Sequence, residues 1–122
     1  MGEKIIMKLI NGNRSSGKTT ALIKYAYKNN ALILCHSIAN KNYIISLAKT
    51  MNLNIINPRT FKEYMFNGSK IYDTKAINGI SLKIDPHIKI VVDDIDCCLT
   101  SILGQRIDCA TGTIQIENLN NI

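Results

Sequence analysis

Residues 12–19 read GNRSSGKT, which matches the pattern G-x-x-x-x-G-K-[ST] at every fixed position. They lie between an apolar run at residues 5–10 and a helical pattern of apolar residues at 17–28. The two glycines let the backbone curl with its N–H groups inward at a helix N-terminus, which makes a nest for an anion. The sequence therefore predicts a phosphate-binding loop made of Gly12, Asn13, Arg14, Ser15, Ser16, Gly17, Lys18, Thr19 and Thr20.

Three side chains of this loop are expected to contact a bound nucleotide. Lys18 reaches the β- and γ-phosphates as a point charge, and the Thr19 hydroxyl is a ligand for Mg²⁺. Thr20 is placed to bond the α-phosphate. The predicted cofactors are therefore ATP, or another nucleoside triphosphate, and Mg²⁺, with Lys18 acting in catalysis. The alternative is a Gly- and Ser-rich turn with an incidental lysine.

A second stretch, residues 88–94, reads IKIVVDD and ends in two carboxylates. A carboxylate at the C-terminal tip of a buried strand lies where parallel α/β sheets bind their ligands. We expect Asp93 to hold Mg²⁺ together with Thr19, and Asp94 to act in catalysis by accepting the proton of an attacking water. The alternative is that the two acids, with Asp96, only cap the helix that follows.

The hydrophobic pattern predicts an α/β fold in a single domain of residues 1–122. Alternating strands and helices predict a mostly parallel sheet that is covered on both faces. The first strand is expected to be buried. The predicted strands are residues 5–10, 31–35, 53–56, 88–93 and 113–117, and the predicted helices are 17–28, 40–51, a short helix opening at 60, and 96–103.

Local signals refine this pattern. Asn40 is expected to cap the second helix, and Thr60 and Glu63 have the T-x-x-E spacing of a capping box. Asn78-Gly79 lies between two alternating runs, which predicts a β-hairpin insertion at 71–84. The first helix is expected to bury a stripe made of Ala21, Leu22, Tyr25 and Ala26.

The charge is unevenly distributed along the chain. Residues 1–89 contain 14 Lys and Arg against 4 Asp and Glu, whereas residues 90–122 contain one Arg against 5 acids. The net charge of +6 thus hides a basic segment followed by an acidic one, which indicates a cationic face for a polyanion. The alternative is that the lysines only solvate helix faces.

Cysteine usage and apolar content indicate a cytoplasmic protein, or one in a host cytoplasm if it is viral. The four cysteines lack C-x-x-C spacing, which predicts buried reduced thiols. His36 and His87 have no sequence partners that would indicate a zinc site. No apolar run approaches the ~18 residues of a membrane span, and the apolar start is too short for a secretion signal.

With these motifs in this order, the chain resembles the P-loop NTPases of the additional-strand, RecA-like branch. Over most of its length it is similar to the N-terminal ATPase lobe of superfamily 1 helicases. Residues 12–19 match that family's first motif, and residues 31–42 resemble the following segment, which touches single-stranded nucleic acid. Thr60 and Phe61 stand at its threonine–phenylalanine motif, and residues 91–96 at its aspartate–glutamate motif.

The resemblance implies a three-layer α/β/α RecA-like fold, ATP hydrolysis, and single-stranded DNA bound through the basic face, as in phage or plasmid DNA metabolism. It implies that strand 113–117 inserts between the first strand and the Asp93 strand. It also implies that Asn118 or Gln115 senses the γ-phosphate. Because such motors place the nucleotide between two lobes, a second copy or a partner subunit is expected, with Arg106 a candidate to enter a neighbour's site.

Two departures keep other functions open. Asp94 replaces the family's glutamate and is one methylene shorter, and the family's second lobe is absent from these 122 residues. A nucleotide-binding regulatory or assembly subunit with little hydrolysis is one alternative. A nucleoside or nucleotide kinase is another, because the loop and the following Leu22-Ile23 are similar to those of cellular thymidine kinases.

Overall fold

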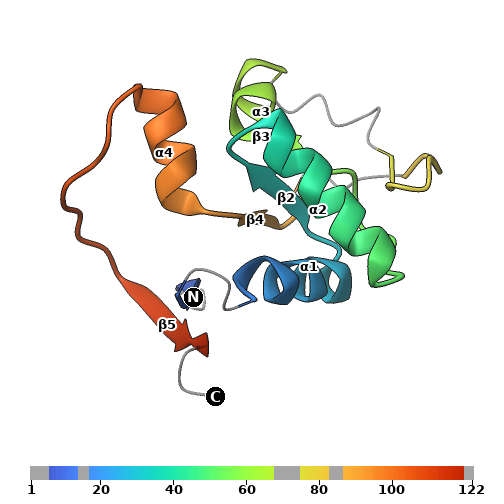
Figure 1. Ribbon diagram of the computed structural model, residues 1–122, viewed down its shortest axis with the longest axis horizontal. Coiled ribbons are helices and arrows are strands. Elements are labelled where there is room, and N and C mark those ends of the chain that lie inside the picture. Colours follow the sequence, from blue (N-terminus) through green and yellow to red (C-terminus); the bar gives the residue numbers. More distant parts are fainter. Residues whose placement is uncertain (1–5, 14–16, 68–74, 83–86, 120–122) are drawn as a thin grey trace.

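The computed structural model describes residues 6–13, 17–67, 75–82 and 87–119 (Figure 1). In these segments strands and helices alternate, as the sequence predicts. In chain order the elements are β1 (Met7–Asn11), α1 (Lys18–Asn29), β2 (Leu32–Cys35), α2 (Ile38–Thr50), β3 (Arg59–Thr60), α3 (Phe61–Asn67), β4 (Ile90–Val92), α4 (Ile95–Leu103) and β5 (Ile114–Asn118).

The strands form two separate parallel sheets, which agrees with the predicted α/β class. One sheet has the order β3-β2-β4, with Leu34 opposite both Arg59 of β3 and Val92 of β4. The other contains β1 and β5, paired from Met7 opposite Ile114 to Asn11 opposite Asn118. Because these strands all pair in parallel, β2 and β4 end side by side, and so do β1 and β5.

Strand β2 is the centre of the hydrophobic core, and all four of its residues are buried. Its side chains alternate between two faces. Ile33 and Cys35 pack with residues of α1 and α2, including Ile23 and Ile44. Leu32 and Leu34 pack on the other face with α3 residues. Helices therefore cover both faces of this small sheet, as predicted.

The β1–β5 pair differs from the expectation in two ways. The first strand is not buried: Met7 is 51% exposed, and every residue of β5 is exposed. The last strand does pair with β1, but in the described part of the chain it is not hydrogen-bonded to β4. The prediction that it lies between β1 and the Asp93 strand is thus half correct. In Figure 1 the pair lies at one side of the molecule, joined to α4 by a long extended segment.

The predicted strand at 53–56 is wrong. Ile55 and Ile56 are buried, but the strand beside β2 is β3, after Pro58. The backbone of 55–57 pairs instead with the turn segment, because Ile77 N–H donates to Ile55 C=O and Asn57 N–H donates to Lys75 C=O. Apolar composition alone did not distinguish these two ways of burying the segment.

Only part of the predicted 71–84 hairpin lies within the described residues. A tight turn is present at Asn78-Gly79, where Gly79 has φ 90°, and Lys75 forms an antiparallel bridge with Ser81. No longer strand forms between residues 75 and 82. This part is a turn docked on residues 54–57; the remainder, 71–74 and 83–84, lies outside the described residues.

Helix starts were predicted with mixed success. The capping box is confirmed: Thr60 N–H donates to Glu63 Oε1 at 2.8 Å, and Glu63 N–H donates to Thr60 Oγ1 at 3.1 Å. The cap of α2 is Ser37 rather than Asn40, because the Ser37 hydroxyl accepts from Asn40 N–H. In α1 the buried residues are Ile23 and Ala26; Ala26 was predicted and Ile23 was not, and the predicted Tyr25 is 38% exposed.

Candidate functional site

The predicted phosphate loop lies between β1 and α1. Gly12 and Asn13 follow β1, and Gly17 precedes α1, which begins at Lys18. Gly17 has φ 88°, a left-handed conformation that glycine adopts without strain. A Cβ at this position would meet nothing within 4 Å, so the requirement for glycine here is conformational and not spatial. Arg14, Ser15 and Ser16 lie outside the described residues.

The start of α1 carries no negative charge of its own. No acidic residue lies in its first turn, and Gly17 provides no side-chain cap. Among the described residues none caps this helix start with a side chain, so its N–H groups and the positive end of the helix dipole could bind an external anion. Thr20 lies in this first turn and is half-buried.

Lys18 folds back onto the loop. Its Nζ donates to Gly12 C=O at 2.7 Å and lies 3.5 Å from Asn13 C=O. The ammonium group thus ties the end of β1 to the start of α1. In this position its charge is beside the loop, where a phosphate oxygen would replace a carbonyl as its acceptor.

Asp93 and Thr19 are in direct contact, although 74 positions separate them in the chain. Thr19 Oγ1 donates to Asp93 Oδ1 at 3.1 Å. Asn40, from the first turn of α2, donates from Nδ2 to Asp93 Oδ2 at 3.0 Å. Asp93 is only 5% exposed, so this carboxylate is held in one orientation by two neutral donors.

The backbone explains why Asp93 is placed there. Its N–H donates to Leu34 C=O at 2.9 Å, which extends the pairing of β4 with β2 by one residue. Its C=O accepts from Cys98 Sγ at 3.3 Å. Cys98 is fully buried, and burial raises the pKa of its thiol to about 12. Cys98 is therefore a neutral donor that fixes the start of α4.

The Thr19–Asp93 pair has the chemistry of a magnesium site. Both groups offer hard oxygen atoms, which Mg²⁺ prefers. Among the ion pairs of the described residues, none involves Asp93. A buried carboxylate that has only neutral partners is favourably placed to accept a cation, since burial of an unpaired charge costs free energy.

The side chain of Asp94 lies near other residues than that of Asp93 does. It is the N-cap residue of α4 and has φ 54°, which is left-handed for a non-glycine residue. Its side chain makes no capping hydrogen bond, so the alternative that it only caps the helix is wrong. Its carboxylate lies near His36, the residue after β2, and Cys97, in the first turn of α4. One possible ligand atom from each of these three residues lies within 4.8 Å of the other two.

Three residues of this region were missed or misread in the sequence. Asn40 is not a cap but a donor to Asp93. His36 and Cys97 both lie near Asp94, so His36 does have possible metal-ligating partners. They meet because the parallel strands β2 and β4 end side by side. The D-x-x-C spacing of Asp94 and Cys97 places both on one face of a helical turn, which is a signal in the sequence for this pair.

The other candidates are dispersed. Asn118 lies opposite Asn11, at the loop end of β1, whereas Gln115 lies opposite Lys8 further back along the strand. The position of Asn118 is therefore the better one for reaching the loop. The Arg106 side chain is 84% exposed, and its guanidinium nitrogen lies 3.6 Å from Oδ1 of Asp108, which is also exposed.

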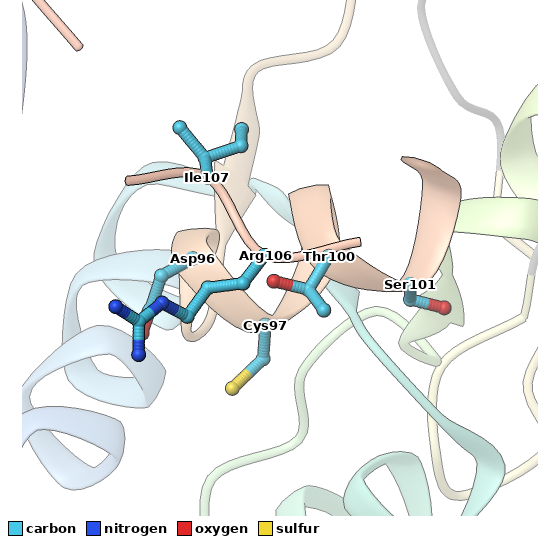
Figure 2. A pocket seen from close by; sticks show the side chains of 6 residues that line it. All are labelled: Asp96, Cys97, Thr100, Ser101, Arg106 and Ile107. Atoms are coloured by element: carbon cyan, nitrogen blue, oxygen red, sulfur yellow. The ribbon is translucent and has the colours of Figure 1, made fainter. Parts of the chain in front are cut away.

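A pocket of ≈ 620 Å³ lies between α4 and the segment that follows it (Figure 2). Asp96 and Cys97 contribute to it from the helix, and Arg106 extends along it from the following segment. No described residue of the predicted phosphate loop lines it. The lining residues are Asp96, Cys97, Thr100, Ser101, Arg106 and Ile107.

All four cysteines are free. Cys35 and Cys98 are buried as predicted, but Cys97 is half-buried and Cys109 is exposed. In the part of the chain that the structure describes, no helix is both long and apolar enough to cross a membrane. No family model, curated protein or solved structure matches the chain.

Proposed function

We propose that this protein binds a nucleoside triphosphate and Mg²⁺ at the start of α1 and hydrolyses the γ-phosphate, as a P-loop NTPase of the RecA-like branch. The observation that carries the proposal is the 3.1 Å hydrogen bond from Thr19 to the buried Asp93. The two residues were chosen from separate motifs in the sequence, and the fold brings their side chains together.

In this proposal each residue of the site has one task. Thr19 and Asp93 hold Mg²⁺, Asp93 acting through the ion's water shell. Bound Mg²⁺ neutralises charge that develops on the phosphate oxygens. Lys18 moves from Gly12 C=O to the β- and γ-phosphates, and the uncapped α1 N-terminus supports the remaining oxygens. Asn40 keeps Asp93 in position, and Asp94 orients the attacking water.

The strand arrangement supports the RecA-like branch. A RecA-like order places the strand after the second acid between the loop strand and the acid strand. Here β5 pairs in parallel with β1, and β4 pairs with β2. Pairing of β5 with β4 would complete that order in one five-stranded sheet. We propose that nucleotide binding, or a second subunit, brings the two sheets into this arrangement.

Single-stranded DNA is the proposed partner, because the basic residues gather on particular elements. Helices α1 and α2 contain lysines and no acidic residue. On α1, Lys24, Tyr27 and Lys28 have the i, i+3, i+4 spacing of one helix face, and all three are exposed. Lysines beside an exposed aromatic ring suit a phosphate backbone and its stacked bases.

The second candidate is a nucleotide-binding assembly subunit with little hydrolysis. The observation that favours it is the position of the Asp94 carboxylate, which makes no capping hydrogen bond and lies with His36 and Cys97. If Asp94 stays there, no described carboxylate other than Asp93 is assigned to the nucleotide, and water is not oriented. A partner subunit would then supply the missing group.

The test is release of phosphate from ATP with Mg²⁺, measured with and without single-stranded DNA. Lys18→Ala should abolish release, and Lys62→Ala, a change of an exposed lysine on α3, should leave it unchanged. Binding of a fluorescent ATP analogue to both variants separates lost affinity from lost hydrolysis. Size-exclusion chromatography with and without ATP shows whether a second copy is recruited.

Release that rises with DNA and is lost in Lys18→Ala supports the ATPase. Tight binding that depends on Lys18, with no release, favours the assembly subunit. A phosphorylated acceptor in place of free phosphate identifies a kinase. Binding that is the same in Lys18→Ala and the unmodified protein would contradict a nucleotide site at this loop.

A further inference from the structure

We propose that His36, Asp94 and Cys97 bind one divalent transition-metal ion of the zinc class, at a site separate from the proposed magnesium site. The observation is the convergence of three different ligand types, an imidazole nitrogen, a carboxylate oxygen and a sulfur, within 4.8 Å of one another. This site goes beyond the proposed NTPase function and does not require it.

The fold explains why the three ligands meet. His36 follows the last residue of β2, and Asp94 lies two residues beyond the end of β4. These strands are parallel neighbours, so their C-terminal ends lie together. Cys97 is three residues after Asp94, one turn along the same helix face. The three side chains thus come from a strand end, a helix cap and a first helical turn.

The distances require only small adjustments. Zinc bonds of about 2.0–2.3 Å in a tetrahedron place the ligand atoms roughly 3.3–3.8 Å apart. The three atoms here are within 4.8 Å of one another, so side-chain rotations can close the difference. Asp94 is exposed and His36 and Cys97 are half-buried, which leaves a path for the ion from solvent.

The local charge also favours a cation. Burial raises the pKa of the Cys97 thiol, and the negative charges of Asp94, Asp96 and Asp93 raise it further. The Asp94 carboxylate is not used by the helix cap and is available as a ligand. Nitrogen and sulfur ligands select zinc-class ions over Mg²⁺, which prefers oxygen. Binding involves no oxidation or reduction: the Cys97 thiol releases its proton to solvent as the sulfur–metal bond forms.

Three protein ligands leave a fourth position for water or another ligand, as in open zinc sites. Cys97 also lines the pocket between α4 and Arg106, so one side of the site adjoins a cavity (Figure 2). Bound metal would hold Asp94 away from the nucleotide. Metal binding at this site is therefore expected to slow phosphate release.

The test is a titration of the purified protein with Co²⁺ as a spectroscopic substitute for Zn²⁺. One equivalent should produce sulfur-to-cobalt charge-transfer absorption and the strong visible bands of a tetrahedral ion, and Zn²⁺ should displace both. Cys97→Ser should remove the charge-transfer band, and His36→Ala should weaken binding by at least about 10- to 100-fold. Matched controls are Cys109→Ser and His87→Ala, which should bind as the unmodified protein does.

Two further measurements make the result decisive. Circular dichroism of each variant shows whether it is folded, and protection of Cys97 from alkylation by Zn²⁺, read by mass spectrometry, tests the unmodified protein directly. A cobalt band that persists in Cys97→Ser, or no protection of Cys97, would overturn the site. Lys18→Ala should bind the metal normally, so failure of the metal site and failure of the nucleotide site give different results.

Discussion

The sheet β3-β2-β4 and the β1–β5 pair differ sharply in packing. All four residues of β2 are buried between helices, whereas all five residues of β5 are exposed. The phosphate loop joins these two regions, because β1 precedes it and α1 follows it. Thr19 and Asp93 therefore belong to the packed region, whereas Gly12 and Asn13 belong to the exposed pair. The contact between Thr19 and Asp93 is thus made within the packed region, whereas Gly12 and Asn13 follow a strand that is mostly exposed.

This difference predicts very unequal thiol reactivity. Cys109, between α4 and β5, is exposed and should react with iodoacetamide at the rate of a free thiol. Cys35 and Cys98 are buried, and burial raises the pKa of Cys35 to about 11. Both need an opening of the packed region before they react, so their labelling should be at least ~10³-fold slower. A time course read by mass spectrometry measures the three rates.

The same experiment contains its own reference, since all thiols label rapidly in denaturant. If Cys35 in the native protein were labelled as fast as Cys109, the core around β2 would not be the stable part of the molecule. The comparison between the two regions would then fail.

Shortening one isoleucine in each region tests the difference in packing through the free energy of unfolding. Ile33→Ala, in β2, should reduce the free energy of unfolding by roughly 2–5 kcal/mol, because Ile33 is 0% exposed and its loss leaves a cavity. Ile116→Ala, in β5, removes the same atoms from a side chain that is 60% exposed and should cost only about 0.5 kcal/mol or less. Urea denaturation of both variants measures the difference. Equal losses would show that β5 is packed in solution.

Within the packed region, Asn40→Ala should have an intermediate effect. The change removes the donor to Asp93 Oδ2 and leaves a buried carboxylate oxygen unsatisfied, which should cost about 1–3 kcal/mol. Asn42→Ala is the matched control, because Asn42 is an exposed residue of the same helix. Denaturation midpoints of both variants provide the measurement. If Asn42→Ala destabilised the protein as much, the contact with Asp93 would not be the cause.

The sequence predicted the parts of the molecule in which local chemistry decides the structure. Thr60 and Glu63 cap α3 as their spacing indicates, and Asn78-Gly79 forms a turn. The pairing of Thr19 with Asp93 was also predictable, because each lies at a strand end or helix start whose position is set by the parallel fold. Such features depend on a few neighbouring residues or on one topological rule.

Two errors are local, at the cap of α2 and in the buried stripe of α1, and the others concern contacts between segments that are distant in the chain. Residues 53–56 are as apolar as a strand, but their backbone pairs with the turn at 75–77. The run at 5–10 is apolar as well, yet Met7 at the start of β1 is 51% exposed. The cluster of His36, Asp94 and Cys97 arises from two strand ends meeting, which no single stretch of sequence records.

The smallest predicted effect concerns one carboxylate in each region. Burial alone would raise the pKa of Glu63, but hydrogen bonds from Thr60 and the charge of Lys41 outweigh it and hold the pKa below its ordinary value. A lowered pKa stabilises the fold above the unfolded-state value, about 4.3 for glutamate, and this stabilisation is lost as pH falls through the lower native value. Glu63→Gln should therefore cost about 1 kcal/mol or less at pH 7 and almost nothing near pH 3.

Glu117→Gln is the matched change in the exposed pair, where Glu117 lies 3.5 Å from Lys8 and is half exposed. A solvent-exposed ion pair contributes little, because water and salt screen it. This variant should follow the unmodified protein at both pH values in urea denaturation. If Glu117→Gln lost as much stability as Glu63→Gln, the β1–β5 pair would be held together more firmly than its exposure indicates. The predicted phosphate loop would then be anchored equally at both of its ends.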